Sequence, residues 1–285
     1  MAHRLPLVFV HGNGIPRPVY QKMLIGLSHR FIATGVDRFG HDPQYRVSDG
    51  WPRLLDQLRT HIGSIGEPVT LLGHGSGGWL SLLAAYRAPE LVSAVILLDS
   101  PVPTVRQAYF LALARRIGIA ALPARFCDNG YDVKAMDPEC QSLYRRFGSR
   151  PSDAAGEHAG ATETRRFDPE VSRRIQQTYP LGLAALVAKG APVSGSGRTI
   201  ACGMLIGEQS RTVRWCGLSA SRGLIGENLV RIGGTHLFPL ERPLVTAKEV
   251  VRLHDRMGGV DPAFGTALMR KPAPARTNVM RAFGS

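Results

Sequence analysis

Short apolar segments that alternate with amphipathic helical segments constrain the fold of this chain more than any other feature. The apolar segments have the length and composition of buried strands and lie at 5–10, 31–36, 68–72, 93–98, 200–206 and 228–232. Apolar residues recur at helical spacing over 18–30, 49–62, 77–86 and 245–257. Strands that alternate with helices predict an α/β fold with a mostly parallel sheet and helices on both of its faces.

The alternation is interrupted between residues 101 and 199. Helices are predicted there over 104–116, 138–147 and 168–189, and a stretch rich in Gly, Ala and Ser at 148–163 predicts a mobile loop. Capping signals open two of the predicted helices, namely Asp49 with Pro52 and Asp168 with Pro169. We therefore divide the chain into a core (1–100 and 200–257), a helical insertion (101–199) and a loosely held basic tail (258–285).

The length of 285 residues and the mass of 30.9 kDa fit one large α/β domain with an insertion. No apolar run reaches the roughly 18 residues of a membrane-spanning helix. The N-terminal apolar run is too short for a signal peptide and leads into His11-Gly12 instead of a small-residue cleavage site. We therefore expect a cytoplasmic protein without a membrane span.

The four cysteines have neither C-x-x-C nor metal-ligand spacing, so free thiols and no metal site are expected. The formal net charge is +13, but the arginines are scattered as pairs such as Arg115–Arg116 and Arg173–Arg174. A nucleic-acid-binding protein would concentrate these charges on one recognisable module. The pattern argues against nucleic acid as a partner and favours a basic surface that attracts anionic substrates.

Glycine-rich turns follow three of the predicted strands. They are H-G-N-G (residues 11–14), G-H-G-S-G-G (residues 73–78) and G-G-T-H-L-F (residues 233–238). Open α/β sheets place ligands at the carboxyl ends of their strands, so these turns are expected to form one site. Glycines in the first turn let backbone N–H groups face a ligand, and the histidine of the third turn can serve as a general base.

Five segments, in this order, resemble the α/β-hydrolase superfamily. They are L-V-F-V-H-G-N-G, D-R-F-G-H-D (37–42), L-L-G-H-G-S-G-G-W, A-V-I-L-L-D-S-P (94–101) and G-G-T-H-L-F-P-L-E-R-P (233–243). The resemblance implies a three-layer α/β-hydrolase fold whose inserted helical lid accounts for 101–199. The family's two leading antiparallel strands are expected to be absent, because the chain begins at the strand before H-G-N-G. An esterase-like serine hydrolase with no cofactor is implied.

The resemblance also implies site residues. His236 matches the general base, and the backbone N–H of Asn13 would bind the oxyanion. The residues expected to form the elbow and the pocket around them are His11, Gly12, Gly14, Gly73, His74 and Gly78.

The acid that orients His236 is not at the family's usual position, where this chain has Ser210. Glu208 is close to that position but out of register. Some family members take the acid from the end of the preceding strand, where this chain has Asp99 in L-L-D-S-P. We prefer Asp99 and keep Glu208 as the alternative acid.

The segment G-H-G-S-G-G can form a nucleophile elbow in two registers. With Gly73 and Gly77 two positions to either side, the apex is Gly75, which has no side chain to act as a nucleophile. In the other register Ser76 is the apex, and the surrounding glycines would tolerate the shift by one residue. The sequence leaves both registers open.

Three functions follow from these alternatives. The first is a Ser-His-Asp hydrolase of a small carboxylic ester or related acyl substrate, in which Ser76 attacks and Asn13 and Gly77 hold the oxyanion. The insertion carries apolar residues that either line an apolar acyl pocket or only pack the insertion itself; they are Tyr109, Phe110, Leu111, Leu113, Leu181 and Leu183. The first alternative predicts a substrate with an apolar acyl part.

The second function is that of a binding protein or pseudoenzyme on the same fold, with Gly75 at the apex. The third is a dinucleotide-binding oxidoreductase, in which residues 73–78 form a G-x-G-x-x-G turn and Asp99 binds the ribose. The sequence does not fix the substrate or the oligomeric state.

Overall fold

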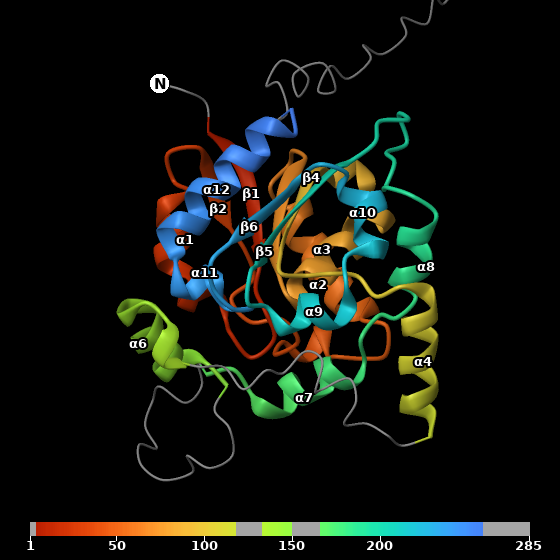
Figure 1. Cartoon of the computed structure of the whole chain (residues 1–285), viewed down its shortest axis with the longest axis horizontal. Coiled ribbons are helices and arrows are strands. Elements are labelled where there is room, and N and C mark those ends of the chain that lie inside the picture. Colours follow the sequence, from red (N-terminus) through yellow and green to blue (C-terminus); the bar gives the residue numbers. More distant parts are fainter. Residues whose placement is uncertain (1–3, 118–132, 150–165, 259–285) are drawn as a thin grey trace, which may run out of the picture.

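The computed structural model describes residues 4–117, 133–149 and 166–258 (Figure 1). A six-stranded sheet in the order β2-β1-β3-β4-β5-β6 lies at its centre, and every neighbouring pair of strands is parallel. The strands are β1 (Leu5–Val10), β2 (Phe31–Thr34), β3 (Val69–His74), β4 (Val92–Leu98), β5 (Ala201–Gly207) and β6 (Leu229–Ile232). The predicted mostly parallel sheet is confirmed, with small shifts at the strand ends.

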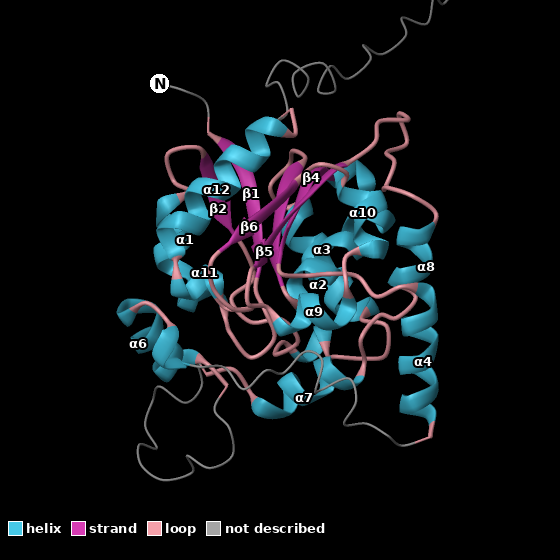
Figure 2. Ribbon diagram, in the orientation of Figure 1, coloured by secondary structure: helices cyan, strands magenta, loops and turns pink. Residues whose placement is uncertain are grey.

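Helices cover both faces of the sheet, as Figure 2 shows. Successive side chains of β1 point to opposite faces. Val8 and Val10 belong to the apolar cluster formed with α2 (Pro52–Gly63), α3 (Ser76–Arg87), α8 (Leu183–Ala188) and α10 (Ser219–Ile225). Leu7 and Phe9 belong to the cluster formed with α1 (Gln21–Gly26), α11 (Phe238–Glu241) and α12 (Pro243–Arg256). The strands are therefore apolar on both sides.

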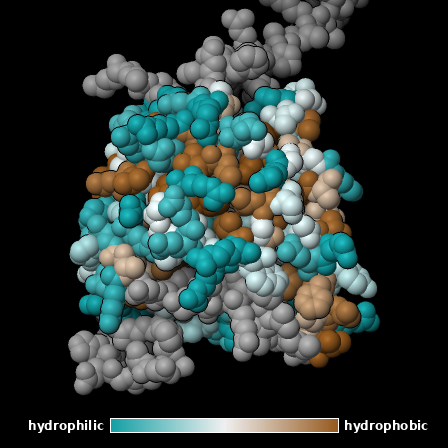
Figure 3. Space-filling model, viewed as in Figure 1, coloured by the Kyte–Doolittle hydropathy of each residue, from teal (hydrophilic) through white to brown (hydrophobic). Residues whose placement is uncertain are grey.

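The predicted insertion contains α4 (Val105–Arg116), α6 (Pro138–Phe147) and α7 (Pro169–Gln177) in addition to α8. The calls of a mobile loop at 148–163 and of a basic tail at 258–285 fall almost wholly outside the described residues. Helix α4 and the residue that follows it keep several apolar side chains exposed on the right-hand side of the view, where Figure 3 shows brown surface; they are Val105, Tyr109, Phe110, Leu113 and Ile117. Within the described ranges, no helix is long and apolar enough to cross a membrane.

Several predicted helices differ from the observed ones. The predicted helix over 168–189 is two helices, α7 and α8, because Pro180 lacks an N–H group and disfavours a helical residue before it. The predicted helix over 18–30 is a 3-10 turn (Arg17–Tyr20) followed by the short α1. Helix α2 begins at Pro52, and Asp49 does not cap it but pairs with Arg115. Helices α9 (Arg211–Cys216), α10 and α11 were not predicted. They have six, seven and four residues, which is too short for a helical repeat of apolar residues to be recognised in the sequence.

The register of the sheet brings the functional turns together. Val10 of β1 is paired with Gly73 of β3, and His74 of β3 with Leu98 of β4. Farther along, Gly207 of β5 is paired with Ile232 of β6. The segments that follow these strands therefore leave the sheet at one edge.

Candidate active site

The turn between β3 and α3 places Gly75 at its apex. Gly75 has φ 52° and ψ −117°, a conformation that residues with a Cβ rarely adopt, and Ser76 is already the first residue of α3. The strand and the helix touch at their glycines: a Cβ on Gly73 would lie 2.5 Å from Cα of Gly78, and a Cβ on Gly77 would overlap the carbonyl oxygen of Val10. This packing leaves no room for side chains two positions to either side of Gly75.

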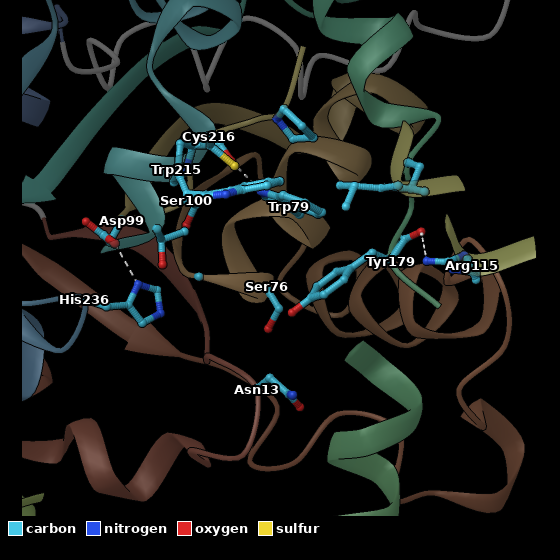
Figure 4. Close-up of a pocket in the computed structure, with 16 residues that line it drawn as sticks. Asn13, Ser76, Trp79, Asp99, Ser100, Arg115, Tyr179, Trp215, Cys216 and His236 are labelled. Atoms are coloured by element: carbon cyan, nitrogen blue, oxygen red, sulfur yellow. Dashed lines mark hydrogen bonds and ion pairs between the residues drawn. The ribbon is translucent and has the colours of Figure 1, made fainter. Parts of the chain in front are cut away.

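His236 lies directly above this turn. A Cβ built on Gly75 would stand 3.1 Å from Nε2 of His236. On the other side of the ring, Nδ1 of His236 is 2.7 Å from Oδ2 of Asp99, as Figure 4 shows. Because the carboxylate can only accept, Nδ1 donates its hydrogen to Asp99, and Nε2 faces Gly75.

Asp99 follows β4 and is fully buried. Its Oδ1 accepts a hydrogen bond from the N–H of Gly207 at 2.9 Å, and its Oδ2 also accepts one from the hydroxyl of Ser210 at 2.6 Å. Ser210, at the position where the sequence resemblance led us to look for an acid, thus donates to the carboxylate of Asp99. Glu208, the alternative acid, is exposed and its backbone N–H binds the carbonyl of Ile232.

His74 holds the loop of His236 in place. Its Nε2 donates to the carbonyl oxygen of His236 at 2.9 Å, and its Nδ1 accepts from the hydroxyl of Tyr20 at 2.7 Å. The two imidazole rings stack with centroids 4.6 Å apart. The pKa of His74 lies well below its usual value, mainly because the ring is buried and also because His236 is close to it. His74 is therefore neutral. Gly12 is needed beside it, since a Cβ there would lie 2.8 Å from Nδ1 of His74.

The turn after β1 packs against the start of α3, where a Cβ on Gly77 would overlap the carbonyl oxygens of Val10 and His11. The Nδ1–H of His11 donates to the carbonyl of Gly12 at 2.8 Å, and its Nε2 accepts from the N–H of Phe39 at 3.0 Å. Burial lowers the pKa of His11 to about 4. His11 is therefore a neutral structural residue.

The same turn also contacts the predicted insertion. The side-chain amide of Asn13 donates to the carbonyl of Ser172 in α7 at 3.0 Å. Gly14 has φ 72°, and its carbonyl accepts from the N–H of Ser149 at 2.8 Å.

A cavity of about 710 Å³, partly open to solvent, lies above Gly75 between the sheet edge and the predicted insertion. Its lining residues are Asn13, Gly75, Ser76, Trp79, Asp99, Ser100, Pro101, Pro103, Leu111, Arg115, Tyr179, Leu181, Thr212, Trp215, Cys216 and His236. A smaller apolar cavity of about 250 Å³ shares Asn13 and Ser76 with it.

Only part of the predicted apolar lining is found in this cavity. Leu111 and Leu181 line it, whereas Tyr109, Phe110 and Leu113 are exposed and Leu183 is in the core. Helix α4 turns one face to the cavity, and on that face Leu111 is followed one turn later by Arg115. Trp79, Tyr179 and Trp215 were missed, because no local pattern distinguishes an aromatic residue of a cavity from one of the core.

Ser76 lines the cavity but is not beside His236. Figure 4 shows its hydroxyl on the side of Asn13 and Tyr179, away from the imidazole. Within the described part of the chain this hydroxyl has no hydrogen bond to His236. As the first residue of α3, Ser76 has a backbone N–H without a partner inside the helix, and this end of a helix favours negative charge.

The comparisons with known proteins agree with this geometry. The sequence model described as "Alpha/beta hydrolase family" matches residues 7–249. The chain belongs to this family. Its carboxylate at position 99 is enclosed by Gly207, Ser210 and His236, so Asp99 is not placed to bind a ribose as the oxidoreductase hypothesis requires.

Two curated proteins illustrate the relationship. The chain is 26% identical over 151 residues to 2-(acetamidomethylene)succinate hydrolase of Mesorhizobium japonicum (strain LMG 29417 / CECT 9101 / MAFF 303099), covering 52% of this chain and 51% of that protein. It is 30% identical over 100 residues to a putative non-heme haloperoxidase of Mycobacterium phage D29, covering 33% of this chain and 36% of that protein. The chain thus matches about half or less of the length of these curated relatives.

Solved structures share the fold over most of the chain. E-2-(acetamidomethylene)succinate hydrolase has a TM-score of 0.59 at 21% identity, covering 89% of this chain and 92% of that chain. The enol-lactonase from Burkholderia xenovorans LB400 has a TM-score of 0.57 at 14% identity, with the same coverage of 89% and 92%. At these identities the likeness establishes the fold.

Proposed function

We propose that this protein hydrolyses a small ester or amide, with the His236–Asp99 pair activating a water molecule above Gly75. The observation that carries the proposal is the 3.1 Å between Nε2 of His236 and the position of a Cβ on Gly75. This is the place of a nucleophile in the fold, and glycine leaves it open to a water molecule. The hydrolases among the relatives and neighbours support this class of reaction.

The chemistry needs no covalent bond to the protein. The water oxygen attacks the acyl carbon while Nε2 of His236 accepts its proton, and Asp99 stabilises the imidazolium that forms. The backbone N–H groups of Asn13 and Ser76 would hold the oxyanion. The bond from the acyl carbon to the leaving oxygen or nitrogen then breaks, and His236 returns the proton to the leaving atom. The products are a carboxylic acid and an alcohol or amine.

Attack by Ser76 is the competing mechanism, and its support is that Ser76 lines the cavity. It would require Ser76 to move into the position of Gly75. The glycine contacts between β3 and α3, such as that of Gly73 with Gly78, oppose this shift. A binding protein without turnover is the remaining alternative.

A panel of p-nitrophenyl esters and anilides with short to medium acyl chains tests the proposal. Wild-type protein is expected to turn over at least one of them above the buffer rate. His236→Gln should lower kcat/KM by about 10³- to 10⁴-fold, because it removes the general base through which Asp99 acts, while Ser76→Ala should leave it within about threefold. Equal losses in both variants would instead identify Ser76 as the nucleophile. If the wild-type protein hydrolysed none of the compounds in the panel, a binding protein would be favoured.

A further inference from the structure

We propose that Arg115 forms an anion-binding subsite in the large cavity, so that the substrates are acyl compounds with a second, uncleaved carboxylate. The assignment of a substrate class rests on the proposed function. The binding of an anion by Arg115 does not depend on it, because it is inferred from the position and contacts of Arg115 alone. Figure 4 shows Arg115 on the opposite side of the cavity from His236, with the ring of Tyr179 between them.

Arg115 is placed in the cavity wall by α4. It follows Leu111 by four residues, so the two side chains share one face of the helix, and both line the cavity. Among the described lining residues it is the one lysine or arginine. The cavity wall also contains apolar residues, among them Leu181 and Pro103.

The contacts of Arg115 leave donors for a ligand. A guanidinium group has five N–H donors. Its Nη1 is 2.9 Å from Oδ1 of Asp49, and its Nη2 donates to the carbonyl of Tyr179 across a long 3.4 Å. Its Nε is buried and has no hydrogen-bond partner among the described residues. Two terminal nitrogens with four hydrogens between them thus make two contacts, one of them weak.

The pairing with Asp49 does not neutralise the subsite. The side chain of Asp49 is 83% exposed, whereas that of Arg115 is 26% exposed. An ion pair with so exposed a partner is weak, because water and salt screen it. A carboxylate inside the cavity would be less hydrated and could take both Nη groups in a bidentate pair.

The three parts of the cavity indicate the class of substrate. The acyl group to be cleaved would lie at His236, a hydrocarbon chain would pack against the apolar wall, and a carboxylate at the far end of the chain would bind Arg115. Half-esters and half-amides of short dicarboxylic acids have this chemistry. The formal net charge of +13 would also draw such anions toward the protein.

Binding of hexanoate and of hexanamide, measured by calorimetry, tests the subsite without any turnover. In the wild type and in His236→Gln, hexanoate should bind about tenfold or more tightly than hexanamide. Arg115→Gln should remove the preference, and Arg115→Lys should keep part of it. Asp49→Asn should raise the affinity for hexanoate a few-fold, because the guanidinium loses its competing partner. Thermal unfolding of each variant checks folding, and Asp49→Asn reports on the subsite even where an Arg115 variant does not fold.

Kinetics provide the second readout. The wild type should prefer the mono-p-nitrophenyl ester of adipic acid over p-nitrophenyl hexanoate in kcat/KM, and Arg115→Gln should lose this preference mainly through KM. A preference for hexanoate that survives Arg115→Gln would place the carboxylate elsewhere and overturn the inference, as would equal binding of acid and amide by the wild type. Failure of the proposed function looks different: neither ester would be turned over, while the Arg115-dependent preference in binding would remain.

Discussion

The carboxyl ends of β3 and β4 lie side by side in the sheet, and both turn through a residue of positive φ, 52° in Gly75 and 49° in Asp99. At Asp99 a side chain is present, although this backbone conformation costs a non-glycine residue on the order of 1–3 kcal/mol. Three hydrogen bonds to its carboxylate compensate for that cost. At Gly75 the same kind of turn is free of the cost and has no reactive side chain. The hydrogen-bonded pair of His236 and Asp99 thus forms beside a turn whose apex has no side chain.

The largest loss of activity is expected from replacing Asp99, the residue that follows β4. Asp99→Asn keeps the size of the side chain but removes the anion that orients and stabilises protonated His236. We expect kcat to fall by about 10³- to 10⁴-fold, as when the acid of a catalytic triad is replaced. The measurement is kcat on the best ester of the panel. A loss of less than about tenfold would show that Asp99 does not act with His236.

The sequence predicts the β4 end better than the β3 end. The resemblance to α/β-hydrolases favours Asp99 over Glu208, because some family members take the acid from the end of this strand, and in the structure Asp99 is hydrogen-bonded to His236. The four glycines around Ser76 carry no such information, since glycine tolerates either register. Long-range contacts decide the register: Gly73 against α3, and Gly77 against the carbonyl of Val10. These contacts depend on strand order, which local periodicity does not contain.

The same limit explains the other differences. All six strands could be predicted because their apolar runs are local features, and the break at Pro180 was visible in the sequence but overlooked. The face of α4 that meets the cavity could not be predicted, because apolar residues lie all around that helix. Only the tertiary structure shows that Arg115 lies on the face of α4 that lines the cavity.

The free energy of unfolding should fall in acid because two buried histidines near Gly75, His11 and His74, have lowered pKa values in the folded protein. His11 has a pKa of about 4 in the folded protein, and its unfolded value is near 6.5. Between these values the unfolded chain binds the proton first, so the free energy of unfolding falls as the pH falls, by roughly 3 kcal/mol for this residue. His74 acts in the same direction.

Urea unfolding at pH 7 and pH 4.5 measures this effect. His11→Gln should reduce the difference between the two pH values, and His29→Gln, at an exposed position, should not. If His11→Gln left the difference unchanged, His11 would not be held neutral by the fold. The β4 end has no histidine in its own turn, so Asp99→Asn should not reduce the difference by this route.

A smaller effect sharpens the comparison at Asp99. Ser210→Ala removes one of the three donors to the carboxylate, and it also removes the oxygen that accepts a hydrogen bond from the N–H of Val213. We expect kcat to fall about three- to tenfold and the protein to lose about 1 kcal/mol of stability. Ser210→Thr, which keeps the hydroxyl, should retain most of the activity. A loss as large as that of Asp99→Asn would mean that Ser210 does more than support the acid.

The most direct test of the central claim is intact-protein mass after incubation with a fluorophosphonate. If Gly75 holds the nucleophile position, the wild type and Gly75→Ala should remain unmodified, whereas Gly75→Ser should gain one adduct in the peptide that contains position 75. Adding His236→Gln to Gly75→Ser should abolish that adduct. An adduct on wild-type protein that disappears in Ser76→Ala would contradict the account and show that Ser76 is the nucleophile.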